Sequence, residues 1–172
     1  HYILLFGPRG IGKTLFLALL RHRVAADEAL SGRLRVAWLN EDETTTSFLD
    51  LLLRIYRELA AEYPDEFPLG VLPDGGGHGR AAALRLVQRQ LLDRLKDRTL
   101  LVLVENLDAV FSGLGDAGQK QWRAFLQEHP VTCLVATSQQ LFSGMTRRKN
   151  PFFGFFDAEQ LRPLSVAEAI EL

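Results

Sequence analysis

Short runs of apolar residues alternate along the chain with longer stretches in which apolar residues recur at helical spacing. A short apolar run that ends at a glycine or a polar residue is typical of a buried strand, and a long amphipathic stretch is typical of a helix. This pattern predicts strands at residues 2–6, 34–40, 99–104 and 131–138, with a last strand within 152–164. It predicts helices at residues 14–26, 47–59, 81–96, 116–128 and 139–146.

Strands that alternate with helices predict an α/β fold in which helices cover both faces of a parallel sheet, a three-layer sandwich. The crossovers between the strands should be right-handed. Ser47 and Asp50 resemble a capping box that opens the second predicted helix. Residues 63–80 are expected to form a loop, since the consecutive glycines at 75–77 hold no single backbone conformation cheaply.

Length and composition describe one ordinary globular domain. The 172 residues suffice for a single substantial core, and 47% of them are hydrophobic and 24% charged. The net charge of −1 predicts no overall attraction to nucleic acid or anionic lipid. Cys133 is the only cysteine, which excludes an intramolecular disulfide. No apolar run reaches the roughly 20 residues of a membrane span, and no signal peptide is visible, so we expect a cytoplasmic protein.

The two ends of the sequence predict a domain cut from a longer protein. His1 already lies inside an apolar run, and Leu172 lies inside an amphipathic segment in which Ser165 and Glu168 resemble another capping box. We therefore expect residues 1–164 to form the core and 165–172 to begin a further segment. Part of the function would then depend on attached domains.

The stretch "GPRGIGKT" after the first predicted strand matches the phosphate-binding pattern G-x-x-x-x-G-K-[ST]. Glycines let successive N–H groups turn toward phosphate oxygens, and the following helix adds the positive end of its dipole. Lys13 would place an ammonium group against the β- and γ-phosphates, and Thr14 would offer its hydroxyl to Mg²⁺. The predicted nucleotide-binding residues are Gly7, Pro8, Arg9, Gly10, Ile11, Gly12, Lys13, Thr14 and Leu15. The alternative is a glycine turn that only connects a strand to a helix.

The stretch "LLVLVENLD" supplies the acidic group that a phosphate-bound Mg²⁺ needs at the end of a nearby strand. Glu105 is the first acidic residue after the apolar run, so it is expected on the metal side. Asn106 stands where a general base would follow, and an amide can orient a water molecule but cannot accept its proton. Asp108 is a further carboxylate nearby. The alternative is a buried strand whose polar end makes only turn or cap hydrogen bonds.

The strand within "VTCLVATS" ends in two hydroxyl residues, Thr137 and Ser138. If this strand lies between the other two, either side chain could sense the γ-phosphate or the attacking water. Ser138 could equally serve only as a helix cap. The phenylalanines at 152, 153, 155 and 156 could stack on bases, although a core strand is the preferred interpretation.

With these motifs the chain resembles the AAA+ and STAND branches of the P-loop ATPases, and most closely the origin-recognition-like modules of prokaryotic multidomain proteins. The resemblance rests on "FGPRGIGKT", "LLVLVENLDAVF" and "VTCLVATSQQLF". It implies a five-stranded parallel sheet of order 5-1-4-3-2, with ATP at the carboxyl ends of the strands. It also implies a lid or winged-helix segment beginning at 165–172, and an arginine finger among Arg147 and Arg148. An exposed basic turn is the preferred interpretation of these two arginines.

One departure from the family pattern concerns catalysis, because Glu105 and Asn106 stand where the family usually has Asp and Glu. Fast hydrolysis is therefore in doubt, but nucleotide binding is not. Glu41 and Glu43 offer other carboxylates, although the implied sheet order places them at the edge, far from the γ-phosphate. A solvated loop is their preferred interpretation.

The expected activity is ATP binding with slow hydrolysis, with Lys13, Glu105, Asn106 and Thr137 as catalytic residues and with Thr14 and Glu105 as metal ligands. The nucleotide state would drive assembly or conformational change in attached domains. A nucleotide-gated scaffold and a DNA-associated loader are the alternatives, although the net charge does not support DNA binding. The protein is also expected to be able to form a homo-oligomer. The guanine-reading pattern N-K-x-D is absent, which favours ATP over GTP.

Overall fold

The computed structural model describes residues 1–40, 45–73 and 79–163 of the chain. Five strands form one sheet, in which every pair of neighbours is parallel. The strand order is β2-β3-β4-β1-β5, which is the predicted order 5-1-4-3-2 read from the other edge. The strands are β1 (Tyr2–Phe6), β2 (Leu34–Leu39), β3 (Thr99–Val104), β4 (Thr132–Ser138) and β5 (Asp157–Gln160). The predicted parallel sheet and its order are confirmed.

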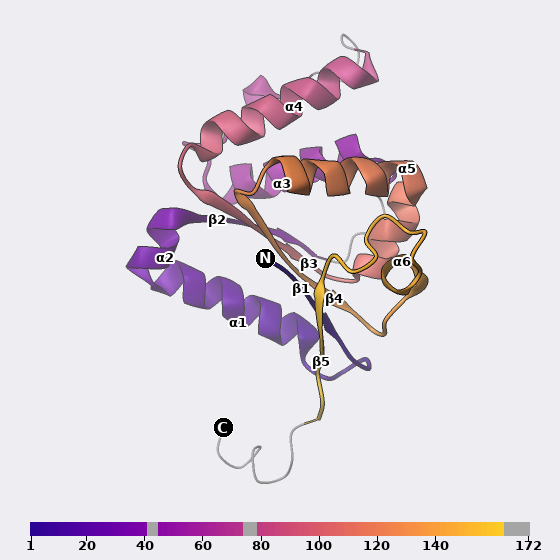
Figure 1. Ribbon diagram of the computed structural model, residues 1–172. Coiled ribbons are helices and arrows are strands. Elements are labelled where there is room, and N and C mark those ends of the chain that lie inside the picture. The colour runs from indigo at the N-terminus through magenta and orange to yellow at the C-terminus, as the bar shows by residue number, and fades with distance from the viewer. Residues whose placement is uncertain (41–44, 74–78, 164–172) are drawn as a thin grey trace.

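Helices cover both faces of the sheet, as the alternating pattern predicts (Figure 1). On one face lie α1 (Lys13–Ala26) and α2 (Glu28–Arg33), and on the other lie α3 (Phe48–Glu62) and α5 (Leu107–Glu128). The remaining helix of this side, α4 (Arg80–Leu95), packs against α3 on the side away from the sheet. A single 3₁₀ turn, η1 (Leu69–Val71), precedes α4, and the short α6 (Ser143–Thr146) follows β4.

Two hydrophobic clusters hold the layers together, one on each face of the sheet. The larger lies under α3 and α5, and its fully buried members include Tyr56 and Trp122. The smaller lies under α1, where Leu17 and Val24 are the buried residues of that helix. α1 therefore packs on the sheet through a narrow apolar stripe. Its first turn lies before this stripe, so it can face the end of the sheet.

The predicted start of α3 at a Ser47 cap, with Ser47 and Asp50 in contact, is confirmed. The Ser47 hydroxyl oxygen accepts a hydrogen bond from the Asp50 backbone N–H at 3.2 Å. The Ser47 hydroxyl donates to the Asp50 carboxylate at 2.7 Å. These contacts hold the first turn of α3 where the chain returns from the end of β2.

Two helical predictions need correction. α5 begins at Leu107, shortly after the end of β3, and not at residue 116. Gly115 has φ 60° and ψ −175°, which no helical residue adopts, so it breaks α5 into two segments. The glycines at 113 and 115 interrupt the apolar spacing that would have indicated a helix in the first segment. Gly113 is needed there because its backbone packs directly against the backbone oxygen of Thr45. α6 begins at Ser143 and not at residue 139.

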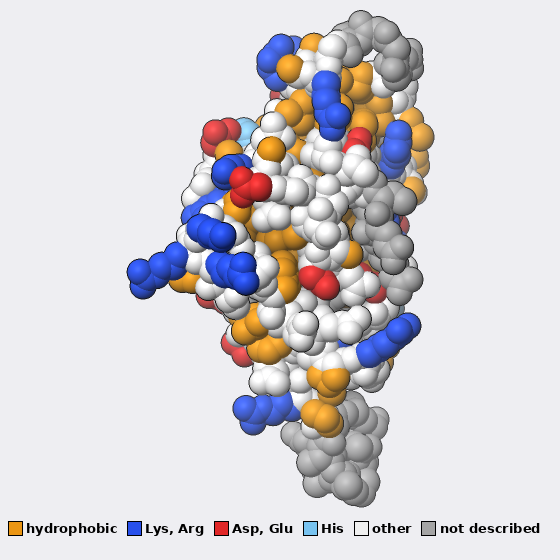
Figure 2. Space-filling model, turned by 90° about the vertical axis from the view of Figure 1, so that its right-hand side faces the viewer, with side chains coloured by type: hydrophobic (Ala, Val, Ile, Leu, Met, Phe, Trp, Pro, Cys, Tyr) orange, Lys and Arg blue, Asp and Glu red, His pale blue; other side chains and the backbone are white. Residues whose placement is uncertain are grey.

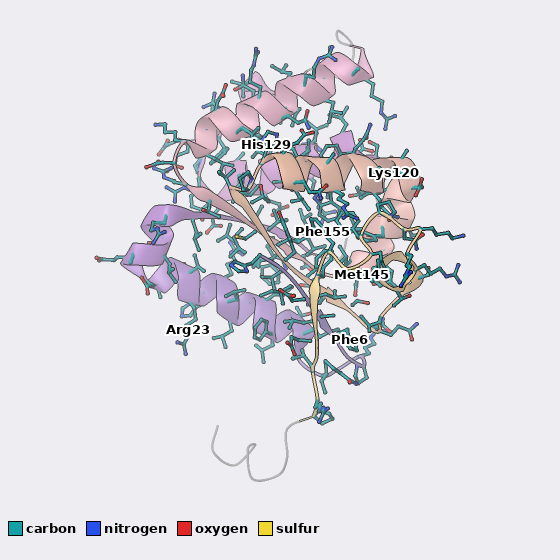
Figure 3. All side chains as sticks on the ribbon, in the orientation of Figure 1. Phe6, Arg23, Lys120, His129, Met145 and Phe155 are labelled. Atoms are coloured by element: carbon teal, nitrogen blue, oxygen red, sulfur yellow. The ribbon has the colours of Figure 1, made fainter. Side chains whose placement is uncertain are left out.

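The expectation that the four phenylalanines form a core strand is wrong, because they precede β5 and lie in a turn. Phe152 alone is fully buried, in contact with Phe111 and Trp122. Phe155 points toward the sheet and stacks on Tyr2 at a ring distance of 4.3 Å (Figure 3). Phe152, Phe155 and Phe156 therefore form a corner of the larger cluster, whereas Phe153 is exposed. The strand itself consists of the exposed residues that follow.

Several predictions fall outside the described residues, namely those on Glu41, Glu43, the glycines at 75–77 and the segment 165–172. Among the helices that the structure describes, none has the length and apolar character needed to cross a membrane.

An ion-pair cluster closes the outer edge of the sheet at β2. Arg35, on β2, binds both carboxylate oxygens of Glu66 at 2.7 and 2.8 Å, and Arg98 binds the same carboxylate. The Tyr63 ring lies against the Arg35 guanidinium. Because Arg35 is only 7% exposed, Glu66 neutralises a charge that water barely reaches. The cluster thereby fastens the end of α3 over the edge strand.

The Glu66→Gln variant is expected to lower the free energy of unfolding by about 2 kcal/mol at neutral pH, since it leaves Arg35 buried without a counter-charge. The hydrogen bond from Arg35, followed by the charges of Arg35 and Arg98, holds the pKa of Glu66 below its ordinary value. The wild-type advantage should therefore be complete above the unfolded-state pKa, roughly 4.3, and vanish as the pH falls through the folded-state pKa.

Urea denaturation of wild type and Glu66→Gln across a pH series measures this difference. Glu128→Gln, at an exposed position on α5, is the matched control and should change stability little. An advantage that stays the same from neutral to strongly acidic pH would contradict the assignment to the Glu66 carboxylate.

Candidate functional site

The glycine-rich stretch forms a loop between β1 and α1 at the carboxyl edge of the sheet. Gly10 has φ 84° and Gly12 has φ 94°, in the left-handed region where a side chain would be strained. α1 begins at Lys13, directly after Gly12, so its first N–H groups open toward the loop. The geometry is that of an anion cradle at a helix N-terminus.

The Lys13 side chain folds back into this loop. Its ammonium group donates to the carbonyl oxygens of Gly7 at 2.8 Å and Pro8 at 2.9 Å. The positive charge is thus held over the loop by the loop itself. It lies where a phosphate group seated on the loop N–H groups would meet it.

Glu105, which directly follows β3, connects the end of this strand to the start of α1. Side chains alternate along β3, and Leu101, Leu103 and then Glu105 face α1. The Thr14 hydroxyl donates to Glu105 Oε2 at 2.9 Å. Glu105 is only 4% exposed. Thr14 and Glu105, the two predicted metal ligands, are therefore in direct contact.

The second carboxylate oxygen of Glu105 has its own donor. The indole N–H of Trp38, on β2, donates to Glu105 Oε1 at 3.1 Å. Sequence reasoning missed Trp38, because it ends a different strand and no motif marks it.

Asn106 occupies an unusual backbone position. Its φ of 51° and ψ of 57° lie in the left-handed helical region, which asparagine tolerates better than most residues. Its carbonyl oxygen accepts from the N–H groups of Ala109 and Val110 and so opens α5. Within the described part of the chain its side chain makes no hydrogen bond, and it lines the same cleft as Lys13 and Thr14. The amide is therefore available to a water molecule or a ligand.

The two hydroxyl residues at the end of β4 differ in their surroundings. β4 lies between β1 and β3, as predicted, so its end borders both the loop and the acidic strand. Thr137 lines the cleft. The Ser138 hydroxyl instead donates to the Gln140 carbonyl oxygen at 2.6 Å and accepts from the Gln140 N–H. Ser138 is thus engaged in a turn, and of the two hydroxyl residues only Thr137 lines the cleft.

These residues surround a single cleft of about 1110 Å³ at the carboxyl ends of the strands. The predicted residues that line it are Arg9, Gly10, Gly12, Lys13, Thr14, Leu15, Glu105, Asn106, Asp108 and Thr137. Arg54, Ala109 and Gln139 line it as well and were not predicted. Arg54 comes from α3 and donates to the carbonyl oxygen of Asn40 at 2.7 Å, so only the fold brings it here. The cleft is large enough for a nucleotide.

Arg147 and Arg148 lie away from this cleft. Both are exposed, with Lys149, in the turn after α6. Seen from the side of α5 and α6, several Lys and Arg side chains gather on one part of the surface (Figure 2). Neither arginine lines the cleft of its own chain, so an arginine-finger role would require a second copy.

The donor set at the cleft fits a magnesium ion. Mg²⁺ prefers oxygen ligands and usually takes one or two protein groups, with water and substrate phosphates completing the octahedron. Thr14 and Glu105 supply a hydroxyl and a carboxylate that already lie within hydrogen-bond distance of each other. Both border the cleft next to Lys13.

No protein-family model matches the sequence, and no characterised protein matches it closely enough to count as a relative. Solved structures match in fold. The Aeropyrum pernix ORC1 protein in complex with DNA has a TM-score of 0.66 at 15% identity, over 99% of this chain and 41% of that protein. The Aeropyrum pernix ORC2 protein, in ADPNP–ADP complexes, has 0.67 at 16% identity, over 93% and 40%. Cdc6p from Pyrobaculum aerophilum has 0.63 at 18% identity, over 99% and 42%.

The chain therefore has the fold of the origin-recognition P-loop ATPases, as its motifs predicted. It spans about two fifths of the length of these neighbours.

Proposed function

We propose that this protein binds ATP with Mg²⁺, hydrolyses it slowly, and uses the nucleotide state to drive assembly or conformational change in attached domains. The observation that carries the proposal is the contact between Thr14 and Glu105. It joins the helix of the phosphate loop to the acidic strand, at the place where both meet Lys13. A glycine turn that merely connected two elements would need none of these three side chains.

Each residue then has a chemical task. The loop N–H groups and Lys13 bind the phosphates, and Thr14 and Glu105 hold the metal ion. Mg²⁺, when bound, neutralises phosphate charge during phosphoryl transfer. Thr137, at the end of β4, is positioned to contact the γ-phosphate or the attacking water. Asn106 orients that water through its side-chain amide, which cannot take the proton.

The neighbours add support of a general kind. The ORC2 structure from Aeropyrum pernix contains ADPNP and ADP, and it shares the fold over 93% of this chain. We extend nucleotide binding to this protein because the cleft here carries its own lysine, hydroxyl and carboxylate at the strand ends.

A fluorescent ATP analogue, titrated with and without Mg²⁺ and competed with ATP, ADP and GTP, tests binding. Phosphate release measured in parallel tests hydrolysis. We expect Mg²⁺-dependent binding that ATP competes away, together with turnover well below the 1–100 s⁻¹ typical of efficient phosphoryl-transfer enzymes. Absence of binding at millimolar nucleotide would refute the proposal.

A nucleotide-gated scaffold is the second candidate, and Asn106 is the observation that favours it. The left-handed backbone at this position suits asparagine, so the missing general base is built into the turn that starts α5. In that case binding would be tight, turnover undetectable, and exchange of ATP for ADP would act as the switch.

A DNA-associated role is the remaining alternative. Among the described residues, the exposed Arg147, Arg148 and Lys149 support it, and the net charge of −1 argues against it. Binding to duplex DNA that weakens steeply with salt would support this role.

A further inference from the structure

The Trp38 indole lies next to the proposed metal site, and the motifs of the sequence assign it no role. β2 runs parallel to β3, with Trp38 beside Leu103 and Leu39 beside Val104. The Glu105 N–H continues this ladder by donating to the Leu39 carbonyl oxygen at 3.0 Å. Trp38 and Glu105 therefore project from neighbouring strands toward the same face of the sheet, the face that α1 covers.

The indole is held on more than one side. Trp38 packs against the smaller hydrophobic cluster, and the Arg21 guanidinium of α1 lies 5.8 Å from its ring centroid. Arg21 is in turn paired with Glu62. These contacts leave the Trp38 ring, near the carboxyl end of β2, little freedom, so its N–H keeps a fixed direction toward Glu105.

The two oxygens of the Glu105 carboxylate are divided between two donors. Oε1 accepts from Trp38 at 3.1 Å, and Oε2 accepts from Thr14 at 2.9 Å. One hydrogen bond would leave the carboxylate free to rotate about its terminal bond. The second hydrogen bond fixes its plane and directs Oε2 toward the start of α1.

We propose that Trp38 is a positioning residue that orients the Glu105 carboxylate for Mg²⁺. The inference rests on the proposed function, because it assumes that the cleft takes a magnesium–nucleotide complex. Loss of a partner that orients a metal-binding side chain typically lowers metal affinity by about 10- to 100-fold. Trp38 would therefore act on the metal, and the phosphate cradle around Lys13 would not depend on it.

Trp38→Phe tests the inference, because it keeps an aromatic ring under Arg21 and removes only the N–H donor. In the presence of ATP, the affinity for Mg²⁺ should fall about tenfold. The affinity for ATP in EDTA should stay at its wild-type value. Trp122→Phe is the matched control: Trp122 is 1% exposed in the larger cluster, so this variant should lose stability without losing Mg²⁺ affinity.

Tryptophan emission gives a second readout that does not depend on turnover. Trp38 and Trp122 are the two tryptophans of the chain. In the Trp122→Phe variant, Trp38 is the sole emitter, and its spectrum should change when Mg²⁺ is added to the ATP-bound protein. The added Glu105→Ala substitution should abolish that change.

The outcomes separate the two proposals. Unchanged Mg²⁺ affinity in Trp38→Phe, or an equal loss of ATP binding in EDTA, overturns the positioning role while wild-type nucleotide binding stands. A Trp38 emission spectrum that does not change when Mg²⁺ is added also overturns the positioning role. A wild-type protein that binds no nucleotide under either condition overturns the proposed function and this inference with it.

Discussion

The Lys13→Ala variant is expected to bind ATP about 100-fold more weakly than the wild type, because a charge-assisted hydrogen bond of about 3 kcal/mol to the phosphates is lost. Lys13 is the cation held over the phosphate loop, by contacts to the Gly7 and Pro8 carbonyl oxygens. The loop N–H groups remain in the variant, so weak residual binding should persist. Phosphate release should fall to background at nucleotide concentrations that saturate the wild type.

Equilibrium titration with the fluorescent analogue measures the effect. Lys120→Ala is the matched control, because Lys120 is an exposed lysine on the outer side of α5 that pairs with Asp116 (Figure 3). This control should bind ATP as the wild type does. The melting temperatures of both variants should be compared, since Lys13→Ala also loses two hydrogen bonds to the loop. Wild-type affinity in folded Lys13→Ala would mean that nucleotide, if bound, lies elsewhere.

The Asn106→Glu variant is expected to raise the turnover of ATP by about 100-fold, because general-base catalysis contributes roughly 10²–10⁴-fold where a carboxylate reaches the attacking water. Asn106 lines the cleft beside Glu105, and its amide has no hydrogen-bond partner in the described residues that a glutamate would have to displace. The left-handed backbone at this position should cost the variant about 1 kcal/mol of stability. Single-turnover phosphate release at saturating ATP isolates the chemical step.

Asn106→Gln is the control that isolates the proton acceptor. It carries the same backbone cost and nearly the same side-chain length, and it cannot act as a base. Equal turnover in the Glu and Gln variants would show that Asn106 is no brake. The base would then have to lie elsewhere, and Asp108 is the candidate because it lines the same cleft from the first turn of α5. In that event Asp108→Asn should abolish the remaining turnover.

Much of the fold could be predicted because its signals are local. Buried parallel strands appear as continuous apolar runs, and four of the five strands were placed within two residues of their observed ends. β5 carried no such signal, since its residues are exposed and mostly polar. The aromatic run before it carried the strand signal instead, although three of its four rings belong to a corner of the core. The first half of α5 was hidden by its glycines, of which Gly113 is required by the close approach of the Thr45 backbone.

The residues of the site also divide into those that a single sequence motif identifies and those that only the fold brings together. The phosphate loop, Glu105 and Asn106 follow from spacing within single motifs. Trp38 and Arg54 come from elements far away in the sequence. The parallel register of β2 and β3 brings Trp38 to Glu105, and the packing of α3 brings Arg54 to the cleft. The left-handed backbone of Asn106 is also beyond sequence reasoning. This backbone conformation gives a reason for an asparagine at position 106. The motif alone shows only that a general base is absent there.

The exposed edge strand β5 bears on how the protein behaves at high concentration. β5 pairs with β1 along one side, and no other described strand covers its outer side. An uncovered strand edge is a template for stacking one molecule onto another and so for aggregation. Asp157 and Glu159 place negative charge on this edge, so two copies brought edge to edge would repel each other. The acidic residues of β5 therefore oppose edge-to-edge stacking of two copies, a task separate from that of the residues that line the cleft.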